Sequence, residues 1–306
     1  MKAMVFHHYG DTLHYEDMPQ PEVQPDDVLV KVYATGVNPV DWKIREGQRK
    51  GAERSFPSIP GWDVSGVIEQ IGRDATGFSI GDEVYGRPDS ARNGTYAQYA
   101  AVRATELSHK PTTVDHIAAA TISLTGLTAW QGIFDHGQLQ PGQRILIHGA
   151  AGGVGIFAVQ LARWKGAHII GTASAKNIDF LKGLGADEVI DYTSVPFEKV
   201  VRNVDMVFDT IGGDTQTKSM EVLKPGGILV STVGIRDKAA LEAKGLKGVQ
   251  YMAQAYPDQL KQLATLVDAG VIKTVIAAVL PLTEAQKAQD MSKEGHTRGK
   301  IALKVV

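Results

Sequence analysis

The sequence predicts an α/β protein with a doubly wound parallel sheet in the middle of the chain and β-rich segments before and after it. Roughly the first 100 residues contain short apolar runs bounded by Pro, Gly and Asp, which is typical of strands in a sandwich or barrel. From about Thr125, predicted strands and helices alternate, as in a parallel sheet with helices on both faces. A glycine cluster at 149–155 joins a buried strand to a helix. These three observations set the expected fold class.

The β-rich part is predicted from its short strand-like runs. Runs 28–34 and 64–71 read as strands, 77–86 reads as a turn followed by a strand, and 95–102 reads as a further strand. The tail from about residue 272 returns to strand-like segments and ends in another at 299–306.

The alternating part begins with a predicted strand at 144–148 and a helix at 155–164. A second strand and helix are predicted at 167–172 and 177–183. Later strands are expected at 204–209, 227–231 and 248–252. We expect the last of these to be the edge strand of the sheet, where it can pair with a second copy in a homodimer.

Composition narrows the function classes. The chain has 306 residues, which suggests about two domains. Lys and Arg total 32 against 34 Asp and Glu, so the net charge is −2 and no basic stripe for nucleic acid is expected. The chain has no Cys, which excludes disulfides, Cys nucleophiles, iron–sulfur clusters and thiolate zinc sites.

Neither a secretory signal nor a membrane span is expected. The first 13 residues alternate like a strand and lack the apolar core of a signal peptide. Uncharged runs at 117–134 and 145–162 are long enough to raise the question of a span, but Gly, Thr, Gln or His recur in both. We interpret both runs as buried core and expect a cytoplasmic protein.

The glycine cluster is the strongest local signal for a ligand. Aligned with G-x-G-x-x-G, it gives Ala150-x-Gly152-x-x-Gly155, with Ala in place of the first glycine. Gly152 allows the backbone to approach a pyrophosphate, and Gly155 allows close helix packing. The N–H groups of the following helix, from Gly153 and Val154 onward, then face the phosphates. We therefore expect a dinucleotide here rather than an ordinary tight turn.

The end of the second strand favours NADP over NAD. In a protein that binds NAD, a carboxylate that binds the ribose 2′-OH is expected there, about 20 residues after the glycines. No acidic residue lies between Lys165 and Asp179, and the position offers Ser174 and Lys176. A hydroxyl and a cation suit a 2′-phosphate, although Lys176 also fits a solvated lysine at a helix start.

With these segments in hand, the chain resembles the zinc-free quinone oxidoreductase (zeta-crystallin-like) branch of the medium-chain dehydrogenase/reductase superfamily. The resemblance spans almost the whole chain, and its specificity lies in the order and spacing of its motifs. These motifs are 36–41, 60–67, 81–85, 94–100, 125–130, 149–155 and 299–303. The resemblance implies a GroES-like β-barrel catalytic domain from 1–124 and 270–306, and a Rossmann NADP-binding domain at 125–269.

The resemblance also implies roles for individual residues. Asn38 and Asp41 are the implied catalytic positions, and Asn38 with Thr128 would position the nicotinamide. The implied cofactor-binding residues are Ala150, Gly152, Gly153, Val154 and Gly155 at the pyrophosphate, Ser174, Lys176 and Tyr192 at the 2′-phosphate, and Thr210, Ile211 and Val233 over the nicotinamide half. Simpler interpretations stay open: Asn38 as a former of an Asn-Pro turn, and Tyr192 as a tyrosine at the core edge.

Zinc-dependent relatives carry a Cys near the Asn38 position and Gly-His-Glu where this chain has Gly61-Trp62-Asp63. We therefore expect no metal and no simple alcohol oxidation, which needs a Lewis acid. The implied reaction is hydride transfer from NADPH to a quinone or an α,β-unsaturated carbonyl (enone or enal).

Two departures from the family bear on the reaction. Lys43 and Arg49 replace tyrosines that members often carry, and the loss of the second counts against an enoyl-thioester reductase. Trp42, Arg45 and Arg49 either shape a substrate mouth or lie on the surface, and no residue is assigned as general acid.

Other classes lack their signatures. None of the nine tyrosines has a Lys four residues later, and there is no Gly-x-Ser-x-Gly elbow or P-loop. One alternative of a different class stays open: an NADPH-binding sensor or structural protein with little turnover.

Overall fold

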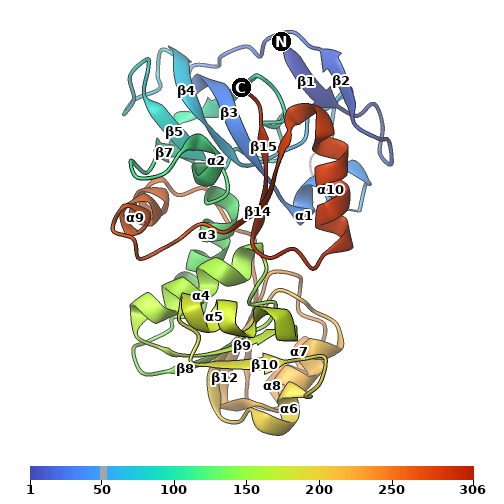
Figure 1. Ribbon diagram of the computed structural model, residues 1–306, viewed down its shortest axis with the longest axis vertical. Helices are drawn as coiled ribbons and strands as arrows, with labels where there is room; N and C mark the ends of the chain where they lie inside the picture. Colours follow the sequence, from blue (N-terminus) through green and yellow to red (C-terminus); the bar gives the residue numbers. More distant parts are fainter. Residues whose placement is uncertain (49–53) are drawn as a thin grey trace. The chain divides into compact units, whose positions relative to one another are not determined.

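The computed structural model describes residues 1–48 and 54–306 (Figure 1). The chain forms two compact units. The first contains Met1–Leu124 and Ala255–Val306, and the second contains Thr125–Gln254. The chain therefore returns to the first unit at Ala255. The sequence predicts this return 15 residues later, at position 270.

The first unit is built on a seven-stranded, mainly antiparallel sheet. Its central strand β3 (Asp27–Val37) is long enough to pair with β15, β4 and β6. The order is β14 (Ile276–Pro281), β15 (Lys300–Lys304), β3, β4 (Val64–Ile71), β5 (Glu83–Gly86) and β7 (Leu107–His109), with β6 (Tyr99–Arg103) on β3. A separate hairpin joins β1 (Lys2–Val5) to β2 (His14–Asp17).

Helices of this unit contact the sheet at several places. They are α1 (Pro39–Arg45), α2 (His116–Ala119), α9 (Pro257–Asp268) and α10 (Ala285–Glu294), with 3₁₀ turns at Ala104–Glu106 and Leu282–Glu284. Helix α9 packs against β7, and the Tyr85 hydroxyl of β5 donates to the Leu260 carbonyl at 2.5 Å. This packing places α9 in the first unit and moves the boundary to Ala255.

The second unit is a six-stranded sheet whose paired strands are all parallel. The strands, in spatial order, are β10 (Glu188–Asp191), β9 (His168–Ala173), β8 (Arg144–Ile147), β11 (Val204–Asp209), β12 (Leu223–Ser231) and β13 (Lys247–Gln250). This is the doubly wound order in which the direction of winding reverses between β8 and β11, and ligands bind at that reversal. Strand β13 lies at the edge of the sheet, as the sequence predicts.

The helices of the second unit are mostly short. They are α4 (Gly153–Lys165), α5 (Ile178–Leu184), α6 (Phe197–Val200), α7 (Asp214–Ser219) and α8 (Lys238–Ala243), with a 3₁₀ turn at Ala175–Asn177. Helix α3 (Ser123–Trp130) and the π-helical turn Gln131–His136 lead from the boundary into this unit. Helix α4 ends at Gly166, whose φ of 82° is one that residues with a side chain rarely adopt.

The predicted α/β class is confirmed, with a parallel doubly wound sheet. Helix α10 corrects the expectation of a purely strand-like tail: it buries Ala285, Ala288 and Gln289, and its other residues are partly buried or exposed. The run 145–162 folds as β8 followed by α4 rather than as one long helix. Across residues 1–48 and 54–306, no helix has the length and apolar character needed to cross a membrane.

Candidate active site

The glycine-rich turn follows β8 and leads into α4. Gly149, not Ala150, makes the tight turn: its φ is +67°, and a Cβ there would lie 2.5 Å from the Thr210 hydroxyl. Ala150 is fully buried and donates its N–H to the Thr172 carbonyl. The G-x-G-x-x-G spacing puts Ala150 in the position of the first glycine, but the tight turn lies one residue earlier, at Gly149.

The other two glycines of the motif meet different demands. A Cβ on Gly155 would lie 2.2 Å from the Gly149 carbonyl, so this glycine gives the close packing that the spacing predicts. A Cβ on Gly152 would meet only that same carbonyl, at 3.2 Å, and otherwise point into open space. The first turn of α4, which includes Gly153 and Val154, has N–H groups without intrahelical acceptors. The turn thus fits a pyrophosphate.

The predicted 2′-phosphate residues come together at the ends of two adjacent strands. Ala173 of β9 pairs with Asp191 of β10, and Ser174 and Tyr192 are the next residues along. Tyr192 is 52% exposed, which excludes the core-edge alternative. Lys176 is exposed in the 3₁₀ turn that follows Ser174.

Asp191 is a carboxylate at this corner that the sequence argument missed, because it lies on the third strand of the motif rather than the second. Hydrogen bonds from Thr193, chiefly from its hydroxyl at 2.7 Å, hold the pKa of Asp191 below its usual range. Ser194 also donates to this carboxylate. Its oxygens are thereby directed into the loop that follows β10.

The loops after β11 and β12 are held by one buried carboxylate, Asp209, which begins the predicted nicotinamide loop but is not among the predicted site residues. Its Oδ1 accepts the backbone N–H groups of Ile211 at 2.9 Å and Gly212 at 3.0 Å. Its Oδ2 accepts from Gln216 at 2.8 Å and from the Ser231 hydroxyl at 2.9 Å. Asp209 therefore ties together the two loops that carry the predicted residues.

Those loops present apolar side chains at the carboxyl end of the sheet. Ile211 is 58% exposed and Val233 is 47% exposed. Thr210 donates its hydroxyl to the carbonyl of His148 at 2.9 Å, which joins its loop to the glycine-rich turn. Exposed apolar side chains at the reversal point of the sheet are suited to contact a flat ring.

His148 anchors the glycine-rich turn from inside the unit. Its ring nitrogens lie 3.0 Å from the Thr172 hydroxyl and 2.9 Å from the Ser219 hydroxyl. Burial lowers the pKa of His148 to about 4, so the ring is neutral at pH 7. Thr128, predicted at the nicotinamide, is half-buried in α3, and its carbonyl accepts the Tyr251 hydroxyl.

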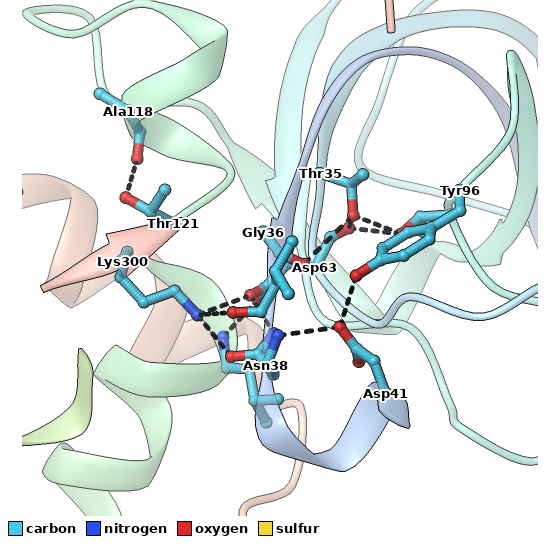
Figure 2. Close-up of polar contacts among 12 residues, drawn as sticks. Thr35, Gly36, Asn38, Asp41, Asp63, Tyr96, Ala118, Thr121 and Lys300 are labelled. Atoms are coloured by element: carbon cyan, nitrogen blue, oxygen red, sulfur yellow. Dashed lines mark hydrogen bonds and ion pairs between the residues drawn. The ribbon is translucent and has the colours of Figure 1, made fainter. Parts of the chain in front are cut away.

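In the first unit, Asn38 and Asp41 lie together at the start of α1 (Figure 2). Asn38 is the extended residue before the helix, and Pro39 begins it, so the Asn-Pro interpretation also describes its backbone. The Asp41 carboxylate accepts the Asn38 backbone N–H at 2.8 Å and the Tyr96 hydroxyl at 2.8 Å. Asp41 is fully buried, and its contacts make it a helix-capping group rather than one exposed to a ligand.

The Asn38 side chain is held by two charged residues that the sequence argument did not single out as site residues. Its Nδ2 donates to Oδ2 of Asp63 at 2.7 Å, and its Oδ1 accepts from Lys300 Nζ at 2.5 Å. Asp63 Oδ1 accepts the Leu124 backbone N–H at 2.7 Å. Lys300 also donates to the Val37 carbonyl at 2.9 Å and lies 3.7 Å from Asp63. Figure 2 shows this cluster between β3, α1 and β15.

Two glycines make room for the cluster. A Cβ on Gly36 would lie 2.5 Å from Oδ2 of Asp63, and one on Gly61 would lie 2.2 Å from the Tyr96 ring. The hydroxyls of Thr35 and Thr95 donate to the Asp63 carbonyl at 2.7 and 2.6 Å. The motifs at 36–41, 60–67, 94–100 and 299–303 thus meet in one buried polar cluster, which explains why their residues stand where they do.

Burial dominates the electrostatics of this cluster. It raises the pKa of Asp41 to about 7, more than the Asn38 N–H and the Tyr96 hydroxyl lower it. Burial also raises the pKa of Asp63, opposed chiefly by the charge of Lys300, and lowers the pKa of Lys300, opposed chiefly by the charge of Asp63. With a pKa of about 7, Asp41 is about half protonated at neutral pH, and it lies beside the Asp63–Lys300 ion pair.

The sequence leaves open whether Trp42, Arg45 and Arg49 shape a substrate mouth or lie on the surface, and the structure gives Trp42 and Arg45 different environments. Arg45 is buried and donates to Gln289 of α10 at 2.8 Å and to the Asp11 carbonyl, so it holds structure together instead. Lys43 lies over the Trp42 ring, 5.4 Å from its centroid. Arg49 lies outside the described residues.

The described residues of this cluster do not fit a zinc ion. The Asp63 carboxylate already accepts from the Asn38 amide and the Leu124 backbone N–H, and it forms an ion pair with Lys300. The chain has no Cys that could serve as a ligand. Within residues 1–48 and 54–306, no three His, Cys, Asp or Glu side chains are grouped to hold a metal. The Lys300 ammonium group already lies 3.7 Å from the Asp63 carboxylate, so a metal cation would compete with it for that carboxylate.

Comparisons with known proteins agree on a family. The sequence model of the alcohol dehydrogenase GroES-like domain matches residues 24–112, and that of the zinc-binding dehydrogenases matches residues 184–303. The chain is 35% identical to the mitochondrial NAD(P)H oxidoreductase RTN4IP1 of Mus musculus, over 100% of this chain and 89% of the relative.

Two further relatives carry more specific names. The NADPH-dependent alkenal/one oxidoreductase of Arabidopsis thaliana, a chloroplastic protein, is 33% identical over 99% of this chain and 79% of its own length. The solved structure of the quinone oxidoreductase from Coxiella burnetii superposes with a TM-score of 0.94 at 34% identity, and the match covers 100% of this chain and 99% of that one. Because the relatives named here include mitochondrial and chloroplastic proteins, a cytoplasmic location stays a prediction.

Proposed function

Since the chain belongs to the medium-chain dehydrogenase/reductase superfamily and is an oxidoreductase, we propose that it transfers a hydride from NADPH to a conjugated acceptor without zinc. The acceptor class is a quinone or an α,β-unsaturated ketone or aldehyde. The observation that carries this proposal is the set of contacts around Asn38, where an ammonium group and a hydrogen-bonded carboxylate hold the amide in place of a metal site.

NADP(H) is the cofactor that the second unit fits best. The N–H groups of α4 and the open space at Gly152 would hold the pyrophosphate. Ser174, Lys176 and Tyr192 would hold the 2′-phosphate at the ends of β9 and β10. Relatives such as the Arabidopsis thaliana enzyme are named as NADPH-dependent, which supports the same choice.

The residues then have separate tasks in the reaction. Bound NADPH supplies the hydride. Thr210, Ile211 and Val233 would cover the nicotinamide half and exclude water, with Asp209 holding their loops in place. Asn38 and Thr128 would orient the ring, while Asp41 fixes the backbone of Asn38 from behind.

A conjugated acceptor suits this machinery because its carbon skeleton spreads the charge that the hydride brings. Such an acceptor needs no Lewis acid, and its enolate or hydroquinone anion can take a proton from water. The names of the relatives include both an alkenal/one reductase and a quinone oxidoreductase, so both acceptors belong in the test.

The experiment follows nicotinamide absorbance when the purified protein is mixed with a quinone, a short 2-alkenone or a 2-alkenal. Loss of NADPH with the alkenone or alkenal defines a double-bond reductase, and loss with the quinone alone defines a quinone reductase. Binding of NADPH without loss under any acceptor contradicts the proposal and supports the alternative of a non-catalytic NADPH-binding protein.

We also propose a homodimer paired through β13. The strand lies at the sheet edge with one side unpaired within the described residues, and a second copy can extend the sheet there. Light scattering at micromolar protein would give twice the chain mass of 32.9 kDa, and the monomer mass would contradict it.

A further inference from the structure

The Asn38 amide is clamped between two opposite charges inside the first unit. Its oxygen accepts from the Lys300 ammonium at 2.5 Å, and its nitrogen donates to the Asp63 carboxylate at 2.7 Å. Asn38, Lys300 and Asp63 are 2%, 3% and 0% exposed. Water therefore screens neither contact well.

This arrangement determines which way the amide faces. An ammonium group can only donate, and an ionised carboxylate can only accept. If the Asn38 amide rotated by half a turn, its NH₂ would face Lys300 and its oxygen would face Asp63. Both contacts would then be repulsive in a low-dielectric interior, where such terms are strong. Neighbours that can both donate and accept, such as hydroxyls or amides, would not discriminate between the two orientations.

Lys300 is an expensive way to fill this space, because burying an ammonium group costs several kcal/mol before its partners compensate. The local backbone is constrained to bring it there. Gly299 adopts φ +79°, and a Cβ on it would lie 2.2 Å from the Val275 carbonyl. Lys300 then donates its backbone N–H to that carbonyl and its side chain to the Val37 carbonyl. A buried methionine would fill similar volume without a charge.

We propose that Lys300 is a positioning residue for hydride transfer: it fixes the orientation of the Asn38 amide, with Asp63 as its counter-charge. Among the described residues, Asp63 is the only acceptor for Asn38 Nδ2, so the second hydrogen of that nitrogen remains for an oxygen of the cofactor or substrate. This inference rests on the proposed function, because the role of Asn38 at the nicotinamide is part of that proposal.

The test compares Lys300→Met with Lys304→Met, the same substitution at an exposed lysine on the same strand. Lys300→Met is expected to lower kcat by about 10- to 100-fold, the scale on which misplacement of a site group acts. The Kd for NADPH should stay unchanged, because the groups that hold its phosphates lie in the other unit. Lys304→Met should leave both values unchanged. An unchanged kcat in Lys300→Met would overturn the proposal.

Lys300→Met also leaves the buried Asp63 carboxylate without its counter-charge, so this variant should lose stability as well as kcat. The double variant Lys300→Met/Asp63→Asn removes both charges and should recover the thermal midpoint. It should not recover kcat, because a neutral amide at position 63 accepts either orientation of Asn38. Recovery of kcat together with stability would overturn the proposal, since Lys300 would then serve only to balance charge.

A double-mutant cycle tests whether Lys300 acts through Asn38. In an Asn38→Ala background, adding Lys300→Met should cost no further kcat, although each substitution alone lowers it. Full additivity of the two losses would contradict the proposal, because it would show that Lys300 acts by another route.

A readout that needs no turnover keeps this inference separate from the proposed function. Hydrogen exchange of the Asn38 side-chain NH₂, identified in NMR spectra by its loss in Asn38→Ala, should be slow in the unaltered protein and in Lys304→Met. It should be faster in Lys300→Met. If the protein reduces no acceptor, the proposed function fails, yet equal exchange in Lys300→Met is still what would overturn the clamp.

Discussion

The ammonium group of Lys300 donates to the side-chain oxygen of Asn38 at 2.5 Å, although 262 positions separate the two residues in the sequence. Strand β15, which carries Lys300, pairs with β3, whose end leads directly into Asn38. The pairing of the last strand with the central strand therefore completes the polar cluster of the first unit. The C-terminal segment is part of the site as well as of the fold.

Asp41 should make stability fall as the pH rises. Its pKa is raised from 3.8 to about 7 by burial, so between those values only the folded protein holds the proton. The free energy of unfolding should drop across this window by up to about 4 kcal/mol, and no further above it. Denaturant titrations from pH 4 to 8 check this. Asp41→Asn should flatten the profile, whereas Asp74→Asn at the surface should not; the same slope in Asp41→Asn would contradict the assignment.

His148 should produce the opposite slope. Burial lowers its pKa from 6.5 to about 4, so between those values the unfolded chain binds a proton that the folded protein does not. Stability should decrease as the pH falls through this window, by up to about 3 kcal/mol. The measurement is again the unfolding free energy against pH, with His148→Gln compared with His8→Gln at an exposed position. An acid slope that survives in His148→Gln would rule out this histidine as its source.

The corner formed by β9 and β10 should determine cofactor preference. Ser174→Asp places a carboxylate where the 2′-phosphate is expected, and Lys176→Ala removes a cation beside it. Each should lower kcat/KM for NADPH by about tenfold or more, the worth of one charge-assisted hydrogen bond, and leave NADH nearly unaffected. Lys182→Ala, one helix further along, is the control. Equal losses with both cofactors would show that the 2′-phosphate binds elsewhere.

Asp209 should be the residue on which the nicotinamide loops depend. Asp209→Asn turns an acceptor of several hydrogen bonds into a group that opposes some of their donors. We expect a loss of about 2–3 kcal/mol in unfolding free energy and weaker NADPH binding. Calorimetry of unfolding and of binding measures both, with Asp214→Asn at the surface as the control. Unchanged NADPH affinity in Asp209→Asn would separate these loops from the cofactor.

Local patterns in the sequence predict much of the fold. The strands at 64–71 and 204–209 have the bounds expected of them, because each is a compact apolar run. Helix α10 was missed because its buried face consists largely of small and polar residues such as Ala285, Ala288 and Gln289. Alternation of apolar residues carries no information about such a face.

The site was predictable only where its residues are neighbours in the sequence. The glycine-rich turn and Ser174 follow predicted strands directly, and strand order alone brings them to one edge. Asp63, Lys300 and Asp209 act through contacts between distant segments, so no local spacing identifies them. Gly36 and Gly61 were visible signals, but their purpose is clear only once Asp63 and Tyr96 are seen to need the space.

Hydride transfer to a conjugated acceptor is tested most directly with NADPH that carries deuterium at the transferred position of its nicotinamide ring. The protein, treated with a metal chelator, would be mixed with this cofactor and a short 2-alkenone, and the product analysed by NMR. Conjugate reduction predicts a saturated ketone with deuterium on the β-carbon, formed at a rate that the chelator does not change. An allylic alcohol with deuterium on the former carbonyl carbon, or a rate abolished by the chelator, would contradict the account.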